Sequence, residues 1–127
     1  MWASTTRPEI YTEVEETILF QLEFPSGALA ACHSSYGINM NYLQVNYEKG
    51  WLKMDPASAY SGNKGSMSDG TIINFENKNQ QAKQMNEDAL AILKKQPLLV
   101  TGEEGLRDIR VVEAIYKAAK SGTRIKI

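Results

Sequence analysis

The sequence places its single histidine, His33, directly after its single cysteine, Cys32. A thiol with an adjacent imidazole suggests either a nucleophile with its base or half of a metal site. Both residues lie in the segment "ALAACHSSY", for which we predict a β-strand, and neighbouring side chains on a strand point to opposite faces. Ser34 and Ser35 follow without the sharp strand-to-helix turn of a serine nucleophile. We therefore assign no catalytic or metal-binding residue here and interpret His33 as a hydrogen-bonded, partly buried side chain.

Two glycine-rich segments could in principle hold a phosphate. The first, "GEEG" at residues 102–105, opens a helix, and helix N-termini attract anions. Its own Glu103 and Glu104 would repel a phosphate, and Thr101 with Glu104 forms the pattern of a capping box. The second, "SGNKGS" at residues 61–66, lacks the glycine spacing of a phosphate-binding loop. The sequence thus predicts helix capping and a loop, with no cofactor-binding residues in this chain.

The first two-thirds of the chain read as β-strands. Apolar residues alternate with polar ones across "EVEETILFQLEF" at residues 13–24, which is typical of a half-buried strand. The turn residues "PSGA" then connect it to a second strand at 28–36, so the pair predicts an antiparallel hairpin. Residues 57–70 are rich in serine and glycine and are expected to form a loop. Further strands are expected in three segments: 40–47, 51–55 and 70–76.

The last third reads as two helices. Residues 80–96 carry apolar side chains at helical spacing, and residues 101–122 have a cap signal at each end, with Gly122 at the C-terminus. In the second helix we expect a buried stripe, and residues 123–127 are expected to return as a strand. The expected stripe consists of Leu106, Ile109, Val112, Tyr116 and Ala119. Strands followed by helices predict an α+β fold: a predominantly antiparallel open sheet with helices packed on one face.

Composition narrows the function classes. The 127 residues fit a single domain at 1–127, and the net charge of −1 provides no basic face for nucleic acid or anionic lipid. No apolar run approaches the length of a membrane span, and the N-terminus lacks the form of a signal peptide. One cysteine is consistent with a reducing compartment. We expect no nucleic-acid or membrane partner and a cytoplasmic location, or a periplasmic one if an export signal precedes this sequence.

Three segments carry a resemblance to a known family: "EVEETILFQLEFPSGALAACHSSYG", "EKGWLKMDPASAYSG" and "TGEEGLRDIRVVEAIYKAAKSGTRIKI". Together they resemble the C-terminal domain of the Gfo/Idh/MocA oxidoreductases, within which the glucose–fructose oxidoreductase branch is most similar. The resemblance covers residues 10–127, and the last segment is its most specific motif. It implies an N-terminal Rossmann domain that binds NAD or NADP, and a C-terminal sheet domain that shapes a sugar site.

The catalytic motifs of that family lie upstream of the matching region. Its catalytic lysine occurs in a Glu-Lys-Pro motif, whereas "EKG" at residues 48–50 lies in a turn, so Lys49 is given no catalytic role. The resemblance implies a substrate-shaping and oligomerisation domain that is inactive alone, with the Rossmann domain lying outside this sequence.

Its implied partners are the Rossmann domain, a sugar or polyol, and further copies of the chain bound through the open sheet face. Near strand ends and loops, Tyr36 and Tyr60 are expected at the substrate rim. The alternative is a stand-alone sugar-binding or protein-interaction module that reuses the same sheet.

Overall fold

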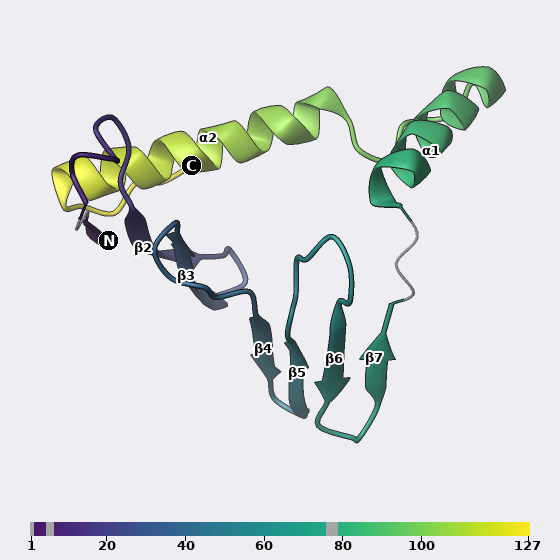
Figure 1. The fold of residues 1–127 in the computed structure, drawn as a ribbon, viewed down its shortest axis with the longest axis horizontal. Coiled ribbons are helices and arrows are strands. Elements are labelled where there is room, and N and C mark those ends of the chain that lie inside the picture. Colours follow the sequence, from purple (N-terminus) through teal and green to yellow (C-terminus); the bar gives the residue numbers. More distant parts are fainter. Residues whose placement is uncertain (1, 5–6, 76–78) are drawn as a thin grey trace. The chain divides into compact units, whose positions relative to one another are not determined.

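The structure is a computed structural model that describes residues 2–4, 7–75 and 79–127 (Figure 1). The chain divides into two compact units. The first unit combines residues 1–39 with 101–127, and the second comprises residues 40–100. All strand pairs given by the described residues are antiparallel, and two helices follow them in sequence. The α+β prediction is confirmed, while the expectation of a single domain over 1–127 stays a prediction.

A three-stranded sheet forms the base of the first unit. Its strands β1 (Trp2–Ser4), β2 (Thr17–Glu23) and β3 (Leu29–Ser35) lie in the order β1-β2-β3. The predicted hairpin is confirmed, because β2 and β3 pair over their full lengths. Gly27 in the connecting turn has φ +86°, a left-handed conformation that glycine adopts without strain.

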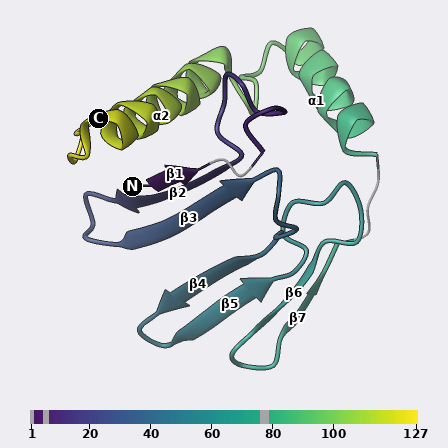
Figure 2. The same cartoon turned by 60° about the vertical axis from the view of Figure 1, so that its left-hand side comes forward.

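The helix α2 (Gly102–Ser121) lies over this sheet in both ribbon views (Figure 2). Its buried residues are Ala114, Ile115 and Ala118, and the buried residue of β2 is Ile18. The predicted buried stripe is therefore wrong. Leu106, Ile109, Val112 and Tyr116 are 44–58% exposed. The helix is apolar on two sides, and the side with small alanines is the one that is buried.

The ends of α2 follow the predicted caps. The Thr101 side chain accepts a hydrogen bond from the Glu104 amide, and Gly122 closes the helix with φ +67°. The Glu104 carboxylate accepts from Arg107 at 2.8 Å, so it pairs within the helix and not with the N-cap. The strand expected at 123–127 is wrong, since these residues have no strand pairing; the Arg124 side chain instead donates to the Glu23 carboxylate.

The second unit contains a four-stranded meander. Its strands are β4 (Leu43–Tyr47), β5 (Gly50–Met54), β6 (Lys64–Met67) and β7 (Ile72–Asn74), each paired with the next. The expected loop at 57–70 is wrong in part, because it contains β6. The sequence of β6 is KGSM, which has no apolar alternation, and the strand is fixed by its pairing with Leu52 to Met54.

One face of this meander is apolar and is called the open face below. Cross-strand partners share a face, so the register brings the open-face side chains together. They are Leu43, Val45, Tyr47, Leu52, Met54, Met67 and Ile73. The three on β4 are 45–51% exposed.

Helix α1 (Gln80–Lys94) follows the meander within the same unit. Its N-cap is Asn79, whose side chain accepts from the Ala82 amide. The amphipathic pattern predicted for 80–96 forms a helix, but its apolar side is uncovered. Met85, Ile92 and Leu93 are 71–79% exposed.

Candidate substrate-rim site

The first unit holds a cluster of charged and aromatic side chains beside the start of β2. Glu16 is buried, with 5% of its surface exposed. Its Oε1 atom accepts from Arg7 Nη2 at 2.5 Å and from Arg7 Nε at 3.1 Å. A buried carboxylate is costly unless a charged partner satisfies it, and here the guanidinium does so. Hydrogen bonding to Glu16, with its negative charge, raises the pKa of Arg7 further above its ordinary value, so the guanidinium stays charged.

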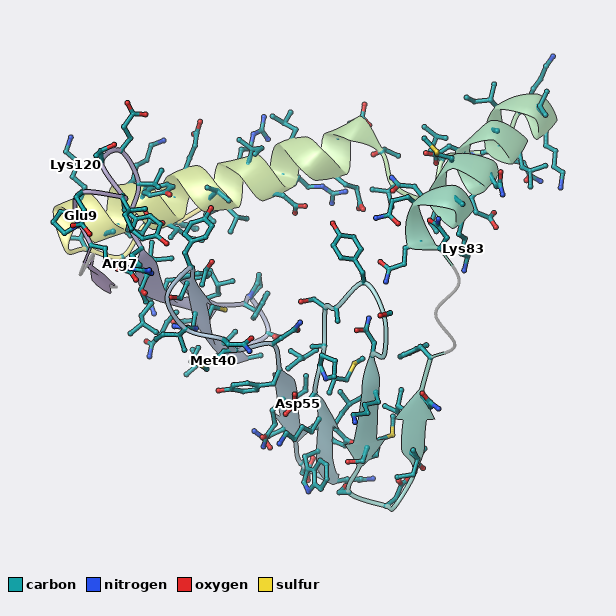
Figure 3. All side chains as sticks on the ribbon, viewed as in Figure 1. Arg7, Glu9, Met40, Asp55, Lys83 and Lys120 are labelled. Carbon is teal, nitrogen blue, oxygen red and sulfur yellow. The ribbon has the colours of Figure 1, made fainter. Side chains whose placement is uncertain are left out.

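Two tyrosines stack beside this ion pair. The rings of Tyr11 and Tyr36 have centroids 5.6 Å apart and planes inclined by 24°. The guanidinium of Arg7, which is labelled in Figure 3, lies 5.3 Å from the centroid of the Tyr11 ring, within the range of a cation–π contact. Tyr36 is 76% exposed. An exposed ring with polar groups around it suits a ligand that has an apolar face and several hydroxyl groups.

The backbone around Tyr36 is held by hydrogen bonds. The Tyr36 amide donates to the Glu16 carbonyl at 2.9 Å. The Ser35 hydroxyl accepts from the amides of Gly37 and Ile38 and also bonds to Thr17. Gly37 has no room for a side chain, since a Cβ there would overlap the Glu16 carboxylate. The position of Tyr36 is therefore fixed by the residues that surround it.

Helix α2 contributes to the same part of the unit through Tyr116. Its hydroxyl donates to Glu15 Oε1 at 3.0 Å. This hydrogen bond, with smaller effects from partial burial and from the charges of Glu15 and Tyr36, raises the pKa of Tyr116 above its ordinary value. Tyr116 therefore stays a neutral donor at physiological pH.

The two tyrosines expected at the substrate rim lie in different units. Tyr36 belongs to the first unit and to the cluster described above, and Tyr60 belongs to the second. Tyr60 is 79% exposed, and its carbonyl accepts from Gln80 Nε2 at 3.2 Å, which connects its loop to the start of α1. A functional role for either residue stays a prediction.

An open cavity of about 630 Å³ also lies in the second unit. Lys83, labelled in Figure 3, lines it from α1, and Met54 lines it from β5. The Asn63 Oδ1 atom is buried there without a hydrogen-bond partner. Tyr60 is not among the lining residues, but Gln80, which bonds to the Tyr60 carbonyl, lines the cavity.

The remaining predicted features are placed as follows. His33 pairs with Leu19 and Cys32 with Phe20, so the two side chains lie on opposite faces of the sheet.

At the start of α2, hydrogen bonds from the Glu103 amide and from Thr101 lower the pKa of the Glu103 carboxyl, which keeps it ionised. This negative charge at the start of α2 would repel the pyrophosphate of a dinucleotide. The start of α2 therefore does not fit a dinucleotide, and no hydride-transfer step is assigned to its residues.

The described residues contain neither a metal-binding cluster nor a membrane-spanning helix. Residues 2–4, 7–75 and 79–127 contain no group of three or more His, Cys, Asp and Glu side chains that could hold a metal ion. Within the same ranges, neither helix has the length and apolar character needed to cross a bilayer.

Sequence reasoning missed Arg7, Tyr11 and Glu16. The spacing of Arg7 and Tyr11 by four residues was a weak signal that they share one turn. Their approach to Tyr36 depends on the β2–β3 pairing and on the path of the chain before β2, which alternation does not reveal. The sequence places Tyr36 at a strand end, and in the structure Tyr36 directly follows β3.

Comparison with known proteins gave one family. Residues 2–127 match the family model for the C-terminal alpha/beta domain of the Gfo/Idh/MocA oxidoreductases. D-glucoside 3-dehydrogenase of Escherichia coli (strain K12) is 22% identical in an alignment of 125 residues, and the match covers 94% of this chain and 35% of that protein.

A solved structure gives a stronger match. The aldose-aldose oxidoreductase from Caulobacter crescentus, complexed with glycerol, is 40% identical and superposes with a TM-score of 0.88. The match covers 98% of this chain and 39% of that one. The chain therefore spans about a third to two-fifths of the length of these relatives.

Proposed function

The chain belongs to the Gfo/Idh/MocA oxidoreductases, as their C-terminal α/β domain, and from this premise we propose that it shapes the sugar site of an NAD(P)-dependent oxidoreductase. The match over residues 2–127 carries this proposal, because it spans both units of the chain. The cofactor and the catalytic lysine come from an N-terminal Rossmann domain of the same polypeptide. NAD or NADP supplies the hydride acceptor in that domain, and this chain orients the sugar or polyol.

Tyr36 is the residue proposed to contact the substrate. Its ring is exposed on one side and supported on the other by Tyr11. Sugars present a C–H face that packs on aromatic rings, and their hydroxyl groups need polar partners such as the Arg7 guanidinium and the Glu15 carboxylate. The buried Glu16 and the crowded Gly37 hold Tyr36 in place, so we treat them as positioning residues.

Self-association is the second part of the proposal. On the open face of the meander, Leu43, Val45 and Tyr47 are 45–51% exposed, and contiguous apolar surface of this kind marks an interface. We expect two copies to pair through this face. Substituting Val45 with Lys should abolish pairing, as measured by sedimentation velocity at high concentration, while a monomeric unsubstituted protein would contradict the assignment.

A chimera tests the enzymatic role. This chain replaces the matching region of the Caulobacter aldose-aldose oxidoreductase, to which it is 40% identical, and hydride transfer with aldoses is measured. We expect the chimera to turn over, a version with the region deleted to be inactive, and the isolated chain to be inactive. A chimera that folds and binds NAD(P) without turnover would refute the proposal.

Within the chimera, Tyr36→Ala tests the substrate contact. Losing a ring stacked on the sugar should raise KM about two- to twelvefold, since such contacts contribute about 0.5–1.5 kcal/mol. Cofactor affinity should not change. Tyr60→Ala is the matched comparison, because Tyr60 is equally exposed and lies in the other unit. If Tyr60→Ala raises KM and Tyr36→Ala does not, the substrate contact lies in the second unit and the assignment to Tyr36 is wrong.

The alternative function, a stand-alone sugar-binding module, is favoured by the same exposed Tyr36 ring. It predicts that the isolated chain binds aldoses in a calorimetric titration and that Tyr36→Ala abolishes the binding. The oxidoreductase proposal predicts little affinity until the Rossmann domain is supplied.

A further inference from the structure

The second unit contains the open cavity of about 630 Å³ described above, which we call the α1 cavity. Three of its lining residues lie at strand ends: Met54 is the last residue of β5, Asn63 directly precedes β6, and Phe75 directly follows β7. The Phe75 amide donates to the Asn63 carbonyl at 3.2 Å, so backbone pairing continues to this end of the meander. Small-molecule sites ordinarily measure about 300–1,000 Å³, so the cavity is large enough for one.

Helix α1 supplies a polar wall of the α1 cavity. Its five lining residues recur at spacings of three and four, which places them on one side of the helix. They are Gln80, Lys83, Gln84, Glu87 and Asp88. Gln80 Nε2 donates to the carbonyls of Ala59 and Tyr60 at 3.3 and 3.2 Å. These hydrogen bonds connect the polar wall to the loop that precedes β6.

Hydrogen-bond acceptors and negative charge predominate among the polar groups of the cavity. The Asn63 Oδ1 atom is buried without a hydrogen-bond partner, which is unfavourable for a polar atom. In the described part of the chain, the carboxylates of Glu87 and Asp88 form no ion pair. Lys83 is the one cation among the lining residues, so the cavity has one more negative charge than positive. These groups favour a ligand that is a cation and donates hydrogen bonds.

Apolar side chains complete the lining. Phe75 and Val100 line the cavity and are 55% and 58% exposed. A short hydrocarbon chain that packs on them would leave water together with the two side chains, which is favourable. The α1 cavity therefore suits a molecule with a charged amino group at one end and an apolar body at the other.

We propose that the α1 cavity binds a small primary amine in its protonated form. The ammonium group is bound by the carboxylates of Glu87 and Asp88, and its hydrocarbon chain packs on Phe75 and Val100. A further N–H donates to Asn63 Oδ1 once that carboxamide turns about χ2, a torsion that adopts a broad range of angles. This site is independent of the proposed sugar contact, because Tyr36 belongs to the first unit.

Three probes that differ only in their head group test the ligand class. Pentylamine, pentanol and pentanoate are titrated into the isotope-labelled 127-residue chain and followed by nitrogen–proton correlation spectra. We expect pentylamine to shift the side-chain amide signals of Asn63 and the backbone amide signals of Phe75 and Val100, while the Ala114 amide in the first unit stays unchanged. Pentanol should bind at least about fivefold more weakly, since it lacks the charge, and pentanoate should give no shift. Equal affinity for pentanol, tighter binding of pentanoate or no shift with pentylamine would overturn the proposal.

Two substitutions on α1 with opposite expected effects test the placing of the ammonium group. Glu87→Gln removes an attractive charge and should weaken pentylamine binding about fivefold, whereas Lys83→Gln removes a repulsive charge and should strengthen it. Glu48→Gln is the matched control: it makes the same charge change in the turn between β4 and β5, outside the lining residues. It should leave the affinity unchanged. A loss of affinity in all three variants, or in none, would show that the amine does not bind in the α1 cavity.

Discussion

The two units of the chain differ in how they are stabilised. In the described part of the chain, every buried side chain belongs to the first unit: Ile18 and Glu16 from its strand side, and Ala114, Ile115 and Ala118 from α2. The second unit has four paired strands and a helix, but each of its described residues is at least partly exposed. The first unit thus has its own small core, whereas the second is held by strand pairing and needs a further layer to bury its apolar face.

The largest expected effect comes from emptying the core of the first unit. Ile18→Ala should lower the free energy of unfolding by about 2–4 kcal/mol, because a buried isoleucine loses both its contacts and its exclusion from water. The measurement is urea denaturation of the isolated chain, followed by far-ultraviolet circular dichroism. Leu43→Ala, at an open-face residue that is 47% exposed, is the control and should cost less than about 1 kcal/mol. Equal losses would break the contrast between the units.

A smaller effect is expected where the second unit relies on close strand pairing. A Cβ on Gly65 would overlap the Lys53 carbonyl and approach Met54 Cγ to 3.0 Å. Gly65→Ala should therefore push β5 and β6 apart and destabilise their pairing by about 1–3 kcal/mol. Amide hydrogen exchange of Leu52 and Met67 is the readout.

Gly105 provides the control for that substitution, since an added Cβ there meets nothing within 4 Å. Gly105→Ala should stabilise α2 by about 0.5–1 kcal/mol, because alanine is the better helix former. Unchanged exchange in the Gly65→Ala variant would show that the second unit is held by something other than its strand ladder.

The smallest effect concerns the hydrogen bond between the two layers of the first unit. Glu15 raises the pKa of Tyr116, so the stability from this bond is present below the ordinary tyrosine value and is lost as pH rises through the higher folded value. Glu15→Gln should move the Tyr116 titration back toward its ordinary range. Absorbance titration of the tyrosinate, taken as the difference from Tyr116→Phe, measures it. An unmoved titration would mean that the two side chains do not bond in solution.

Alternation was sufficient to predict the β2–β3 hairpin, because period-two patterning and a glycine-containing turn point to the same pairing. Alternation was insufficient for β6, because its Lys, Gly, Ser and Met residues do not alternate between apolar and polar. This segment forms a strand through its backbone pairing with β5. Residues 123–127 show the converse. "TRIKI" alternates well, yet a strand also needs a partner with free backbone groups, and sequence pattern does not specify one.

The α2 helix has two apolar sides, and the sequence pattern did not show which of them is buried. One side has the larger residues, from Leu106 to Tyr116, and was predicted to be buried. The other side, which includes Ala114 and Ala118, is the one that the structure buries. The burial of Ala114 and Ala118 instead follows from their size, since small side chains let a helix approach a sheet closely. At the candidate site, the strand-end position of Tyr36 was visible in the sequence, but its contact with Tyr11 required the path of residues 7–16 to be known.

The Tyr116–Glu15 hydrogen bond joins residues that are 101 positions apart, and so does the contact of Arg124 with Glu23. The meander closes only between consecutive strands. In terms of folding order, the meander can pair as soon as its own residues leave the ribosome, because its contacts are local. The first unit cannot be completed until α2 is synthesised, since α2 supplies most of its buried side chains. The part of the protein that contains the earliest strands is thus the last to close.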